Sequence, residues 1–322
     1  MQEDKMRTVS SAVRTVQPTQ PATALRERFP TFLIVGVAKA GTSSLYDYLG
    51  QHPQIFISPV RAPNFFGLGE QPGPAYGGPV KSRPIHAPTL EAYHALFEGR
   101  QNESALGEGS SYFNFTPRAA ARIQHYISQA RLLIILRQPA ERAYSQYLYA
   151  RRMGWEPATT FQAALDEEPR RQAEGWFPFL CYRESSLYAD KLRAFYDRFP
   201  AEQLHLCLFD DFRRQPAVVV NQIYRFLGVT PDFTPDVSVH HNPATVGLCP
   251  WLRSPHNEKA ARFWRYLPGW LRQRLFQQLS KVNVVQLALE PRLRRQLTAE
   301  FHNDIVATQS LIGRALSQWL IS

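Results

Sequence analysis

The sequence predicts an α/β fold in three layers, with helices covering both faces of a mostly parallel central sheet. Short apolar runs at residues 32–36, 55–57, 105–107, 132–136 and 204–209 have the length and composition of buried strands. Longer helical patterns alternate with these runs, which is the order that parallel strands joined by crossover helices produce. A hydrophobic content of 44% is enough for a sizeable core.

Helical periodicity predicts the elements that separate the strands. The expected helices cover residues 42–49, 90–97, 117–128, 140–153, 161–166, 187–199 and 217–227, and further helices, with breaks, cover 258–279 and 291–320. We expect residues 29–322 to form a single domain. Residues 1–28 mix Ser, Thr, Gln and Pro with charges and predict a disordered tail. No window approaches the roughly 20 apolar residues that span a bilayer, so no transmembrane segment is expected.

Charge and cysteine content narrow the possible partners. The formal net charge is +10, which favours polyanionic partners such as nucleotides, acidic glycans, nucleic acid or a membrane surface. The cysteines are Cys181, Cys207 and Cys249, and their spacing suggests no metal site. Cys207 lies in an apolar run and is expected to be buried. So few cysteines fit a reducing compartment.

A phosphate-binding loop is predicted where the first strand meets the first helix. Gly36 and Gly41 have the G-x-x-x-x-G spacing of a P-loop, but Lys39 lies inside the loop rather than after it. Backbone N–H groups at such a loop converge on an anion, and the helix dipole favours negative charge there. Additional donors come from the hydroxyls of Thr42, Ser43 and Ser44. The alternative is an ordinary strand–loop–helix turn.

A second anion site is predicted after the strand at 132–136. Arg137 follows that strand directly, Pro139 opens a helix, and Ser145 lies about two turns further on. The forked guanidinium of Arg137 suits a phosphate. Two anion sites at two strand ends indicate a ligand whose phosphate groups are separated, which a plain nucleoside triphosphate does not require.

These two segments resemble the nucleotide-binding motifs of a known family. "VGVAKAGTSSLYDYLGQHPQI" and "LRQPAERAYSQY" are similar to the 5′-phosphosulfate loop and the 3′-phosphate motif of sulfotransferases that use 3′-phosphoadenosine-5′-phosphosulfate. The branch with heparan sulfate sulfotransferases and their bacterial relatives is the most similar, and the likeness covers most of residues 30–320. The resemblance implies a P-loop-type fold and transfer of a sulfuryl group to a hydroxyl or amine of a small-molecule, lipid or glycan acceptor.

The resemblance also implies residue roles. Lys39 would contact the leaving oxygen as a catalytic residue, while Arg137 and Ser145 would hold the 3′-phosphate. The 5′-phosphosulfate would be held by Lys39, Ala40, Gly41, Thr42, Ser43 and Ser44. Ser185 and Tyr188 resemble a stretch that lines the nucleotide site. No metal is expected, because Lys39, Arg137 and backbone amides supply the positive field.

One departure from the family pattern concerns the general base. Relatives commonly read Lys-Glu-Pro-x-Phe-Phe, with the glutamate proposed as base, whereas this chain reads "RAPNFF" with Ala62 at that position. Either another group is the base, or the acceptor needs little help, or activity is lost. Glu108 is the first candidate base, although it could equally be structural; His52 and His86 are weaker candidates. A phenol, with a pKa near 10, or a neutral amine would need less assistance.

The acceptor site is expected in loops at 65–88, 153–179 and 240–256. Their aromatic residues line a pocket or pack beneath the loops; they include Trp155, Trp176, Phe177, Phe179 and Trp251. The acceptor's identity and the oligomeric state are left open. We expect a cytoplasmic, bacterial enzyme that binds no nucleic acid. The alternatives are a P-loop kinase or NTPase, with acidic residues in "LCLFDD", and a non-catalytic polyanion-binding protein.

Overall fold

The computed structural model describes residues 29–69, 74–82, 85–238, 246–247, 284–285 and 288–321 of the chain. The predicted tail at 1–28 and the predicted helix at 258–279 lie outside the described residues, as do Cys249 and Trp251.

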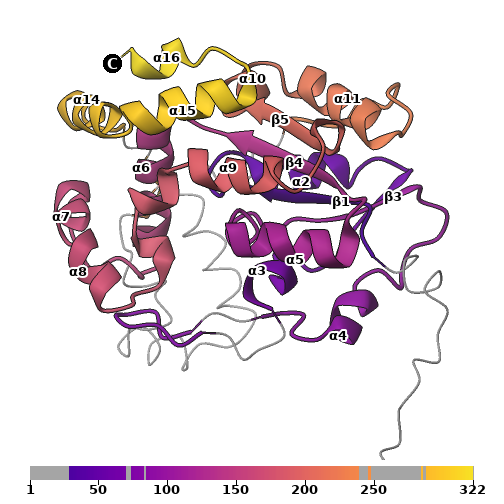
Figure 1. Ribbon diagram of the computed structural model, residues 1–322, viewed down its shortest axis with the longest axis horizontal. Helices are drawn as coiled ribbons and strands as arrows, with labels where there is room; N and C mark the ends of the chain where they lie inside the picture. Colours follow the sequence, from indigo (N-terminus) through magenta and orange to yellow (C-terminus); the bar gives the residue numbers. More distant parts are fainter. Residues whose placement is uncertain are drawn as a thin grey trace, which may run out of the picture.

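Five parallel strands form the central sheet, which confirms the predicted fold class (Figure 1). They are β1 (Phe32–Gly36), β2 (Ile55–Ile57), β3 (Ala105–Glu108), β4 (Arg131–Leu136) and β5 (Leu204–Leu208). Their spatial order is β2-β3-β1-β4-β5. A separate antiparallel pair joins β6 (Val246–Gly247) to β7 (Val284–Val285). All five predicted strands are therefore present, with ends that differ by one residue at most.

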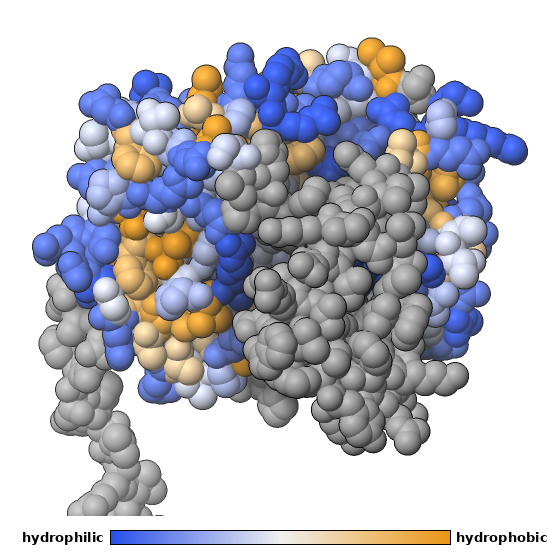
Figure 2. All heavy atoms as spheres, turned by 180° about the vertical axis from the view of Figure 1, so that it is seen from behind, coloured by the Kyte–Doolittle hydropathy of each residue, from blue (hydrophilic) through white to orange (hydrophobic). Residues whose placement is uncertain are grey.

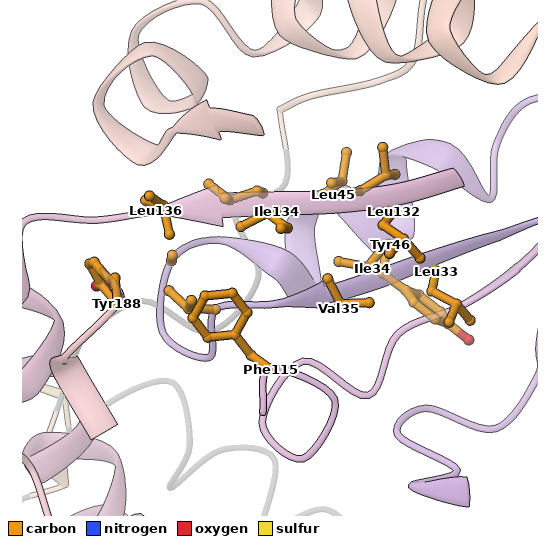
Figure 3. Close-up of a cluster of buried hydrophobic side chains, with 14 of the residues drawn as sticks. Leu33, Ile34, Val35, Leu45, Tyr46, Phe115, Leu132, Ile134, Leu136 and Tyr188 are labelled. Atoms are coloured by element: carbon orange, nitrogen blue, oxygen red, sulfur yellow. The ribbon is translucent and has the colours of Figure 1, made fainter. Parts of the chain in front are cut away.

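The two central strands are continuous apolar runs because both of their faces are covered. Every residue of β1 is buried, and in β4 only Arg131 at the start is exposed. Figure 3 shows their side chains interleaved, with Leu33, Ile34 and Val35 of β1 beside Leu132, Ile134 and Leu136 of β4. Cys207 of β5 is buried as predicted.

Helices cover both faces of the sheet. The helices α5 (Pro117–Ile127) and α9 (Ala189–Tyr196) pack together in front of the strands in Figure 1, while α2 (Thr42–Leu49) lies behind them and contacts α11 (Pro216–Leu227). The helix α6 (Pro139–Arg152) follows β4 and contacts α14 (Pro291–Glu300). The remaining described α-helices are α3 (Phe65–Leu68), α4 (Leu90–Ala95), α7 (Phe161–Asp166), α8 (Glu168–Ala173), α10 (Phe209–Arg214), α15 (His302–Ile312) and α16 (Ser317–Leu320).

Several predicted boundaries were wrong: the helix expected at 90–97 ends at Ala95, and the helix expected at 187–199 ends at Tyr196. The helix expected from Leu187 begins at Ala189, because Leu187 is extended and the amides of Tyr188 and Ala189 donate to Asp304, each at 2.9 Å. Phe209, expected to end a strand, instead begins α10. The short helices α3, α8 and α10 were not predicted.

The strand order creates a switch point between β1 and β4. After β1 the chain crosses to β2 and β3 on one side, and after β3 it crosses back to β4 on the other side. Ligands of open α/β sheets bind beyond the carboxyl ends of strands at such a point. The predicted phosphate loop and Arg137 follow β1 and β4, so both predicted anion sites lie at this edge.

The surface seen from behind is mostly hydrophilic where the structure describes it, with apolar side chains gathered in smaller patches (Figure 2). This is the usual distribution for a globular surface. Among the described residues, no helix is long and apolar enough to cross a membrane.

Candidate active site

The loop between β1 and α2 presents backbone N–H groups to the switch point. Gly41 is the N-cap of α2 at φ 87°, and it provides no side-chain acceptor for the first turn of the helix. A Cβ at this glycine would lie 3.1 Å from Phe212 and would also carry the strain of positive φ. The first-turn amides therefore face a site suited to an anion.

Lys39 lies within this loop, with its backbone at φ 74°. Its Nζ is 4.2 Å from the centroid of the Tyr149 ring. Burial, together with the nearby charges of Arg152, Arg137 and Arg142, lowers the pKa of Lys39 to about 7. An anion bound here would relieve this repulsion.

Arg137 connects the two predicted anion sites. Its Nη1 donates to the carbonyl oxygen of Lys39 at 3.1 Å, and its guanidinium lies 4.7 Å from the Phe209 ring centroid. Glu141 is 3.7 Å away, a distance that leaves donors of the guanidinium available to a ligand. Burial lowers the pKa of Arg137 from its ordinary value.

A cavity of about 550 Å³ unites these groups. Of the predicted binding residues, seven line it: Lys39, Gly41, Thr42, Ser43, Ser44, Arg137 and Ser145. The hydroxyl of Thr42 donates to Ser111 at 3.1 Å. Ser145 is buried on the face of α6 that points to the cavity. This volume is within the usual range for small-molecule sites.

Four predicted site residues do not line the cavity: Ala40, Glu108, Ser185 and Tyr188. Ala40 is buried within the loop. The hydroxyl of Tyr188 donates to the carbonyl of Arg137 at 2.7 Å, so this residue supports the strand end from behind. The hydroxyl of Ser185 donates to the carbonyl of Pro178 at 3.1 Å.

Glu108 is fully buried at the end of β3. Its carboxylate accepts from Ser110 at 2.8 Å and from Asn114 at 3.0 Å. The Ser110 hydroxyl in turn accepts from the backbone N–H of Asn64 at 2.9 Å, which links Glu108 to the segment that contains Ala62. Burial raises the pKa of Glu108 to about 7, against the opposing effect of these hydrogen bonds. Ala62 itself lines the cavity at φ 52°.

The two histidines considered as bases lie away from the cavity. His52 is buried between Tyr224 and Phe233, and its Nε2 lies 2.9 Å from the carbonyl of Thr230. His86 is exposed and does not line the cavity.

Sequence reasoning missed Arg142, which is 1% exposed on α6. Its guanidinium donates to the carbonyl of Ala38 in the phosphate loop at 3.2 Å and to Ser186 at 2.8 Å. It therefore fixes the loop and adds positive charge behind Lys39. The sequence feature that could have identified Arg142 is its position three residues before Ser145, because this spacing puts both side chains on one face of a helix.

The other half of the cavity is aromatic. Its rings belong to Tyr112, Phe113, Tyr149, Trp155, Phe177 and Phe179. The predicted acceptor segment at 153–179 thus supplies three rings, and the described part of 65–88 supplies none. Trp176 packs over Gly78, outside the cavity.

The whole arrangement suits a ligand with two separated phosphates next to an apolar partner. Fixed donors converge at the lysine, where a departing oxygen would gain negative charge. Among the described residues, no group of His, Cys, Asp or Glu could hold a metal ion, and the predicted absence of a metal stays a prediction. Asp210 and Asp211, the acidic residues of the kinase alternative, do not line the cavity.

Comparison with known proteins identifies the family. A model of the sulfotransferase family matches residues 30–235, more than half of the chain. The human bifunctional heparan sulfate N-deacetylase/N-sulfotransferase 3 is 27% identical over 225 residues, 64% of this chain and 23% of that protein. The corresponding enzyme of Drosophila melanogaster is 28% identical over 229 residues, 64% of this chain and 20% of that protein. The matched part of the chain thus spans about a quarter or less of the length of these curated relatives.

One solved structure is similar to this chain over a greater part of its length. A sulfotransferase from Alicyclobacillus acidocaldarius is 32% identical, with a TM-score of 0.70, and the alignment covers 90% of this chain and 98% of that one. Because the family model spans all five strands of the central sheet and the 32% identical structure covers 90% of the chain, the chain belongs to the sulfotransferase family.

Proposed function

We propose that the protein transfers a sulfuryl group from 3′-phosphoadenosine-5′-phosphosulfate to a hydroxyl or amine of an acceptor molecule. The observation that carries this proposal is the joining of two anion sites in one cavity: Arg137 donates to the carbonyl of Lys39 at 3.1 Å, and both side chains line the cavity. Family membership supports sulfuryl transfer over the kinase and polyanion-binding alternatives.

The proposed roles follow from the positions of the donors. The first turn of α2 binds the 5′-phosphate through its amides and the hydroxyls of Thr42, Ser43 and Ser44. Arg137 and Ser145 bind the 3′-phosphate. Arg142 holds the loop in place from the protein interior.

The chemical step is direct in-line transfer. The acceptor atom forms a bond to sulfur while the bond from sulfur to the 5′-phosphate oxygen breaks, and its electron pair stays on that oxygen. Lys39 stabilises the charge that grows there. The cavity contributes by holding donor and acceptor in line.

Glu108 was predicted as a candidate base that could equally be structural. Its complete burial and its hydrogen bonds through Ser110 to Asn64 support a positioning role instead. In this role Glu108 fixes the backbone next to Ala62, which lines the cavity.

The acceptor class and the setting of the enzyme belong to the proposal as well. The names of the heparan sulfate relatives suggest a glycan, while small molecules and lipids fit the family resemblance equally. A bacterial origin is supported by the bacterial source of the 32% identical structure. The cytoplasmic location and the absence of nucleic-acid binding remain predictions.

Titration calorimetry with nucleotides tests the function. We expect adenosine 3′,5′-bisphosphate to bind at least tenfold more tightly than ATP, with no need for magnesium. Tighter binding of ATP would instead support the kinase alternative. Salt-dependent binding of DNA without any nucleotide binding would support the polyanion-binding alternative.

A further inference from the structure

The six rings in the aromatic half of the cavity contact one another and form one continuous wall. This aromatic wall consists of Tyr112, Phe113, Tyr149, Trp155, Phe177 and Phe179. Tyr112 lies 5.6 Å from Phe177 and 4.9 Å from Phe179 between ring centroids, and Phe113 lies 6.1 Å from Phe177. Trp155 lies 5.9 Å from both Phe177 and Phe179. Aromatic rings at such spacings form favourable edge and offset contacts, and they offer the same contacts to a planar ligand.

The wall begins at the lysine of the phosphate loop. The ring of Tyr149, 4.2 Å from Nζ of Lys39, lies 5.7 Å from Phe179 and 5.8 Å from Trp155. A planar molecule against these rings therefore has its edge beside the group that faces the departing phosphate oxygen.

Buried polar contacts hold the wall in place before any ligand arrives. Arg171 forms a two-pronged ion pair with Glu156 at 2.7 and 2.8 Å, and both side chains are at most 1% exposed. The same guanidinium donates to the carbonyl of Leu180 at 3.0 Å, and Gln146 donates to the carbonyl of Phe179 at 2.5 Å. The backbone on both sides of the rings is thus fixed, and preorganised contacts of this kind favour binding.

The aromatic wall has too few polar and charged groups to bind a sulfated polysaccharide. Its six side chains carry only two hydroxyls, on Tyr112 and Tyr149, and one indole N–H, on Trp155. A polyanionic sugar chain would need several cations and donors along its length. The described cations that line the cavity are Lys39, Arg61, Arg137 and Arg213; none belongs to the wall.

Resting on the sulfotransferase function proposed above, we propose that this wall binds a small planar phenol and that the phenolic hydroxyl is the sulfate acceptor. Ala62 stands where relatives have the proposed glutamate base, and no described Asp or Glu lines the cavity. An acceptor that needs no carboxylate base agrees with this lining. A phenol has a pKa of about 10, whereas an aliphatic alcohol resembles water at roughly 16. The phenol can therefore react without a carboxylate base.

In the step, the phenol oxygen forms the new bond to sulfur and the phenolic proton is released to water. The bond between sulfur and the 5′-phosphate oxygen breaks, and its electron pair remains on the bisphosphate. The products are an aryl sulfate, adenosine 3′,5′-bisphosphate and one proton. Lys39 lies beside both oxygens and stabilises negative charge on each.

A set of acceptors with one common ring system tests the inference. The full chain is supplied with 3′-phosphoadenosine-5′-phosphosulfate and with 1-naphthol, 1-naphthalenemethanol, 1-naphthylamine or de-N-sulfated heparan, and products are followed by mass spectrometry. We expect 1-naphthol to react at least 100-fold faster than each of the other three. An equal or faster rate with the benzylic-type alcohol, the amine or the polysaccharide would overturn the inference.

A matched pair of variants tests the wall itself. Phe177→Leu removes a ring from the cavity, while Phe199→Leu makes the same change at a residue of equal exposure, 2%, outside the cavity. We expect Phe177→Leu to raise the KM for 1-naphthol about tenfold without changing the KM for the donor, and Phe199→Leu to leave both constants within twofold. Equal effects of the two variants on the naphthol KM would count against the wall as the acceptor site.

Calorimetry separates failure of this inference from failure of the proposed function. If adenosine 3′,5′-bisphosphate binds but 1-naphthol is neither sulfated nor bound by the enzyme–bisphosphate complex, the phenol inference is wrong and the sulfotransferase function stands. If the bisphosphate itself does not bind, the proposed function fails and the inference fails with it.

Discussion

Lys39 experiences burial and three neighbouring arginines at once, and its pKa is lowered to about 7 as a result. A lysine in this field is partly neutral at neutral pH in the free protein. Phosphate groups placed against it would restore its charge, since an opposite charge favours the ionised form. In the proposed function, Lys39 would therefore couple nucleotide binding to the uptake of a proton.

The first prediction is the pH dependence of this coupling. Binding of adenosine 3′,5′-bisphosphate raises the pKa of Lys39 above 7, so the complex holds more protons than the free protein between that value and the raised one. Affinity is therefore fully present below pH 7 and falls as the pH rises, by up to about tenfold per pH unit. Calorimetry between pH 7.5 and 9, in buffers with different ionisation enthalpies, measures the proton uptake. Lys39→Met should remove it, and unchanged uptake in that variant would assign the proton elsewhere.

The second prediction concerns catalysis by the same residue. Lys39→Ala should lower kcat by a larger factor than it raises the KM for the donor, because the contact strengthens as the leaving oxygen gains charge. Steady-state kinetics with varied donor concentration measures both constants. A normal kcat with only a weaker donor KM would restrict Lys39 to ground-state binding.

The third prediction distinguishes two roles of Glu108. Its pKa is raised from 4.5 to about 7 by burial, so its favourable contribution to stability is present below pH 4.5 and is lost as the pH rises through about 7. Glu108→Gln should therefore be more stable than the natural protein at pH 8, by up to about 3 kcal/mol, with little gain at pH 4.5. Urea unfolding at the two pH values measures this difference.

Activity of the same variant tests the role as base. If Glu108 is a positioning residue, the Glu108→Gln enzyme should keep most of the natural protein's kcat with a phenol. It should also keep the acid limb of the pH–rate profile. A loss of about 100-fold or more, together with disappearance of that limb, would make Glu108 the general base.

At the scale of elements, the buried ion pair of Glu156 and Arg171 ties α8 to the loop after α6. Tyr182 also donates to Glu156, which leaves the carboxylate well supported. Removing one partner of such a pair leaves a buried charge without its counterion, which is costly.

The fourth prediction compares this buried ion pair with the exposed ion pairs of a neighbouring arginine. Arg171→Met should destabilise the fold by about 3–5 kcal/mol. Its neighbour Arg170 forms exposed ion pairs with Glu167 and Glu174, so Arg170→Met should change stability by less than about 1 kcal/mol. Urea unfolding of both variants gives the comparison, and similar losses would mean that the buried pair does not fix this region.

The predictable elements were those whose sequence signals are local. The runs 32–36 and 132–136 could be recognised because both faces of each strand are buried, and the phosphate loop because its glycines and hydroxyls are adjacent in the chain. The start of α9 could not be recognised, since it depends on Asp304, more than 100 residues later. The burial of Glu108 and the shared wall of Tyr112 and Phe177 likewise arise from packing between distant segments.

For the whole molecule, the strand order explains why two segments that are distant in the chain line one cavity. The carboxyl ends of β1 and β4 are adjacent because the chain reverses direction across the sheet between β3 and β4. Lys39 and Arg137, 98 residues apart, are consequently in hydrogen-bond contact through the lysine carbonyl. The topology thus places the two residues proposed to bind the separate phosphates at the same edge of the sheet.

Calorimetry on Arg137→Ala tests this arrangement most directly, using two nucleotides that differ at the 3′ position. Adenosine 3′,5′-bisphosphate should bind the variant more weakly by about 1.5–3 kcal/mol, the usual effect of losing a hydrogen bond to a charged group. Adenosine 5′-phosphosulfate, which lacks the 3′-phosphate, should bind the variant and the natural protein almost equally. An equal loss of affinity for both nucleotides would contradict the assignment of Arg137 to the 3′-phosphate and, with it, the account of two anion sites serving one sulfuryl donor.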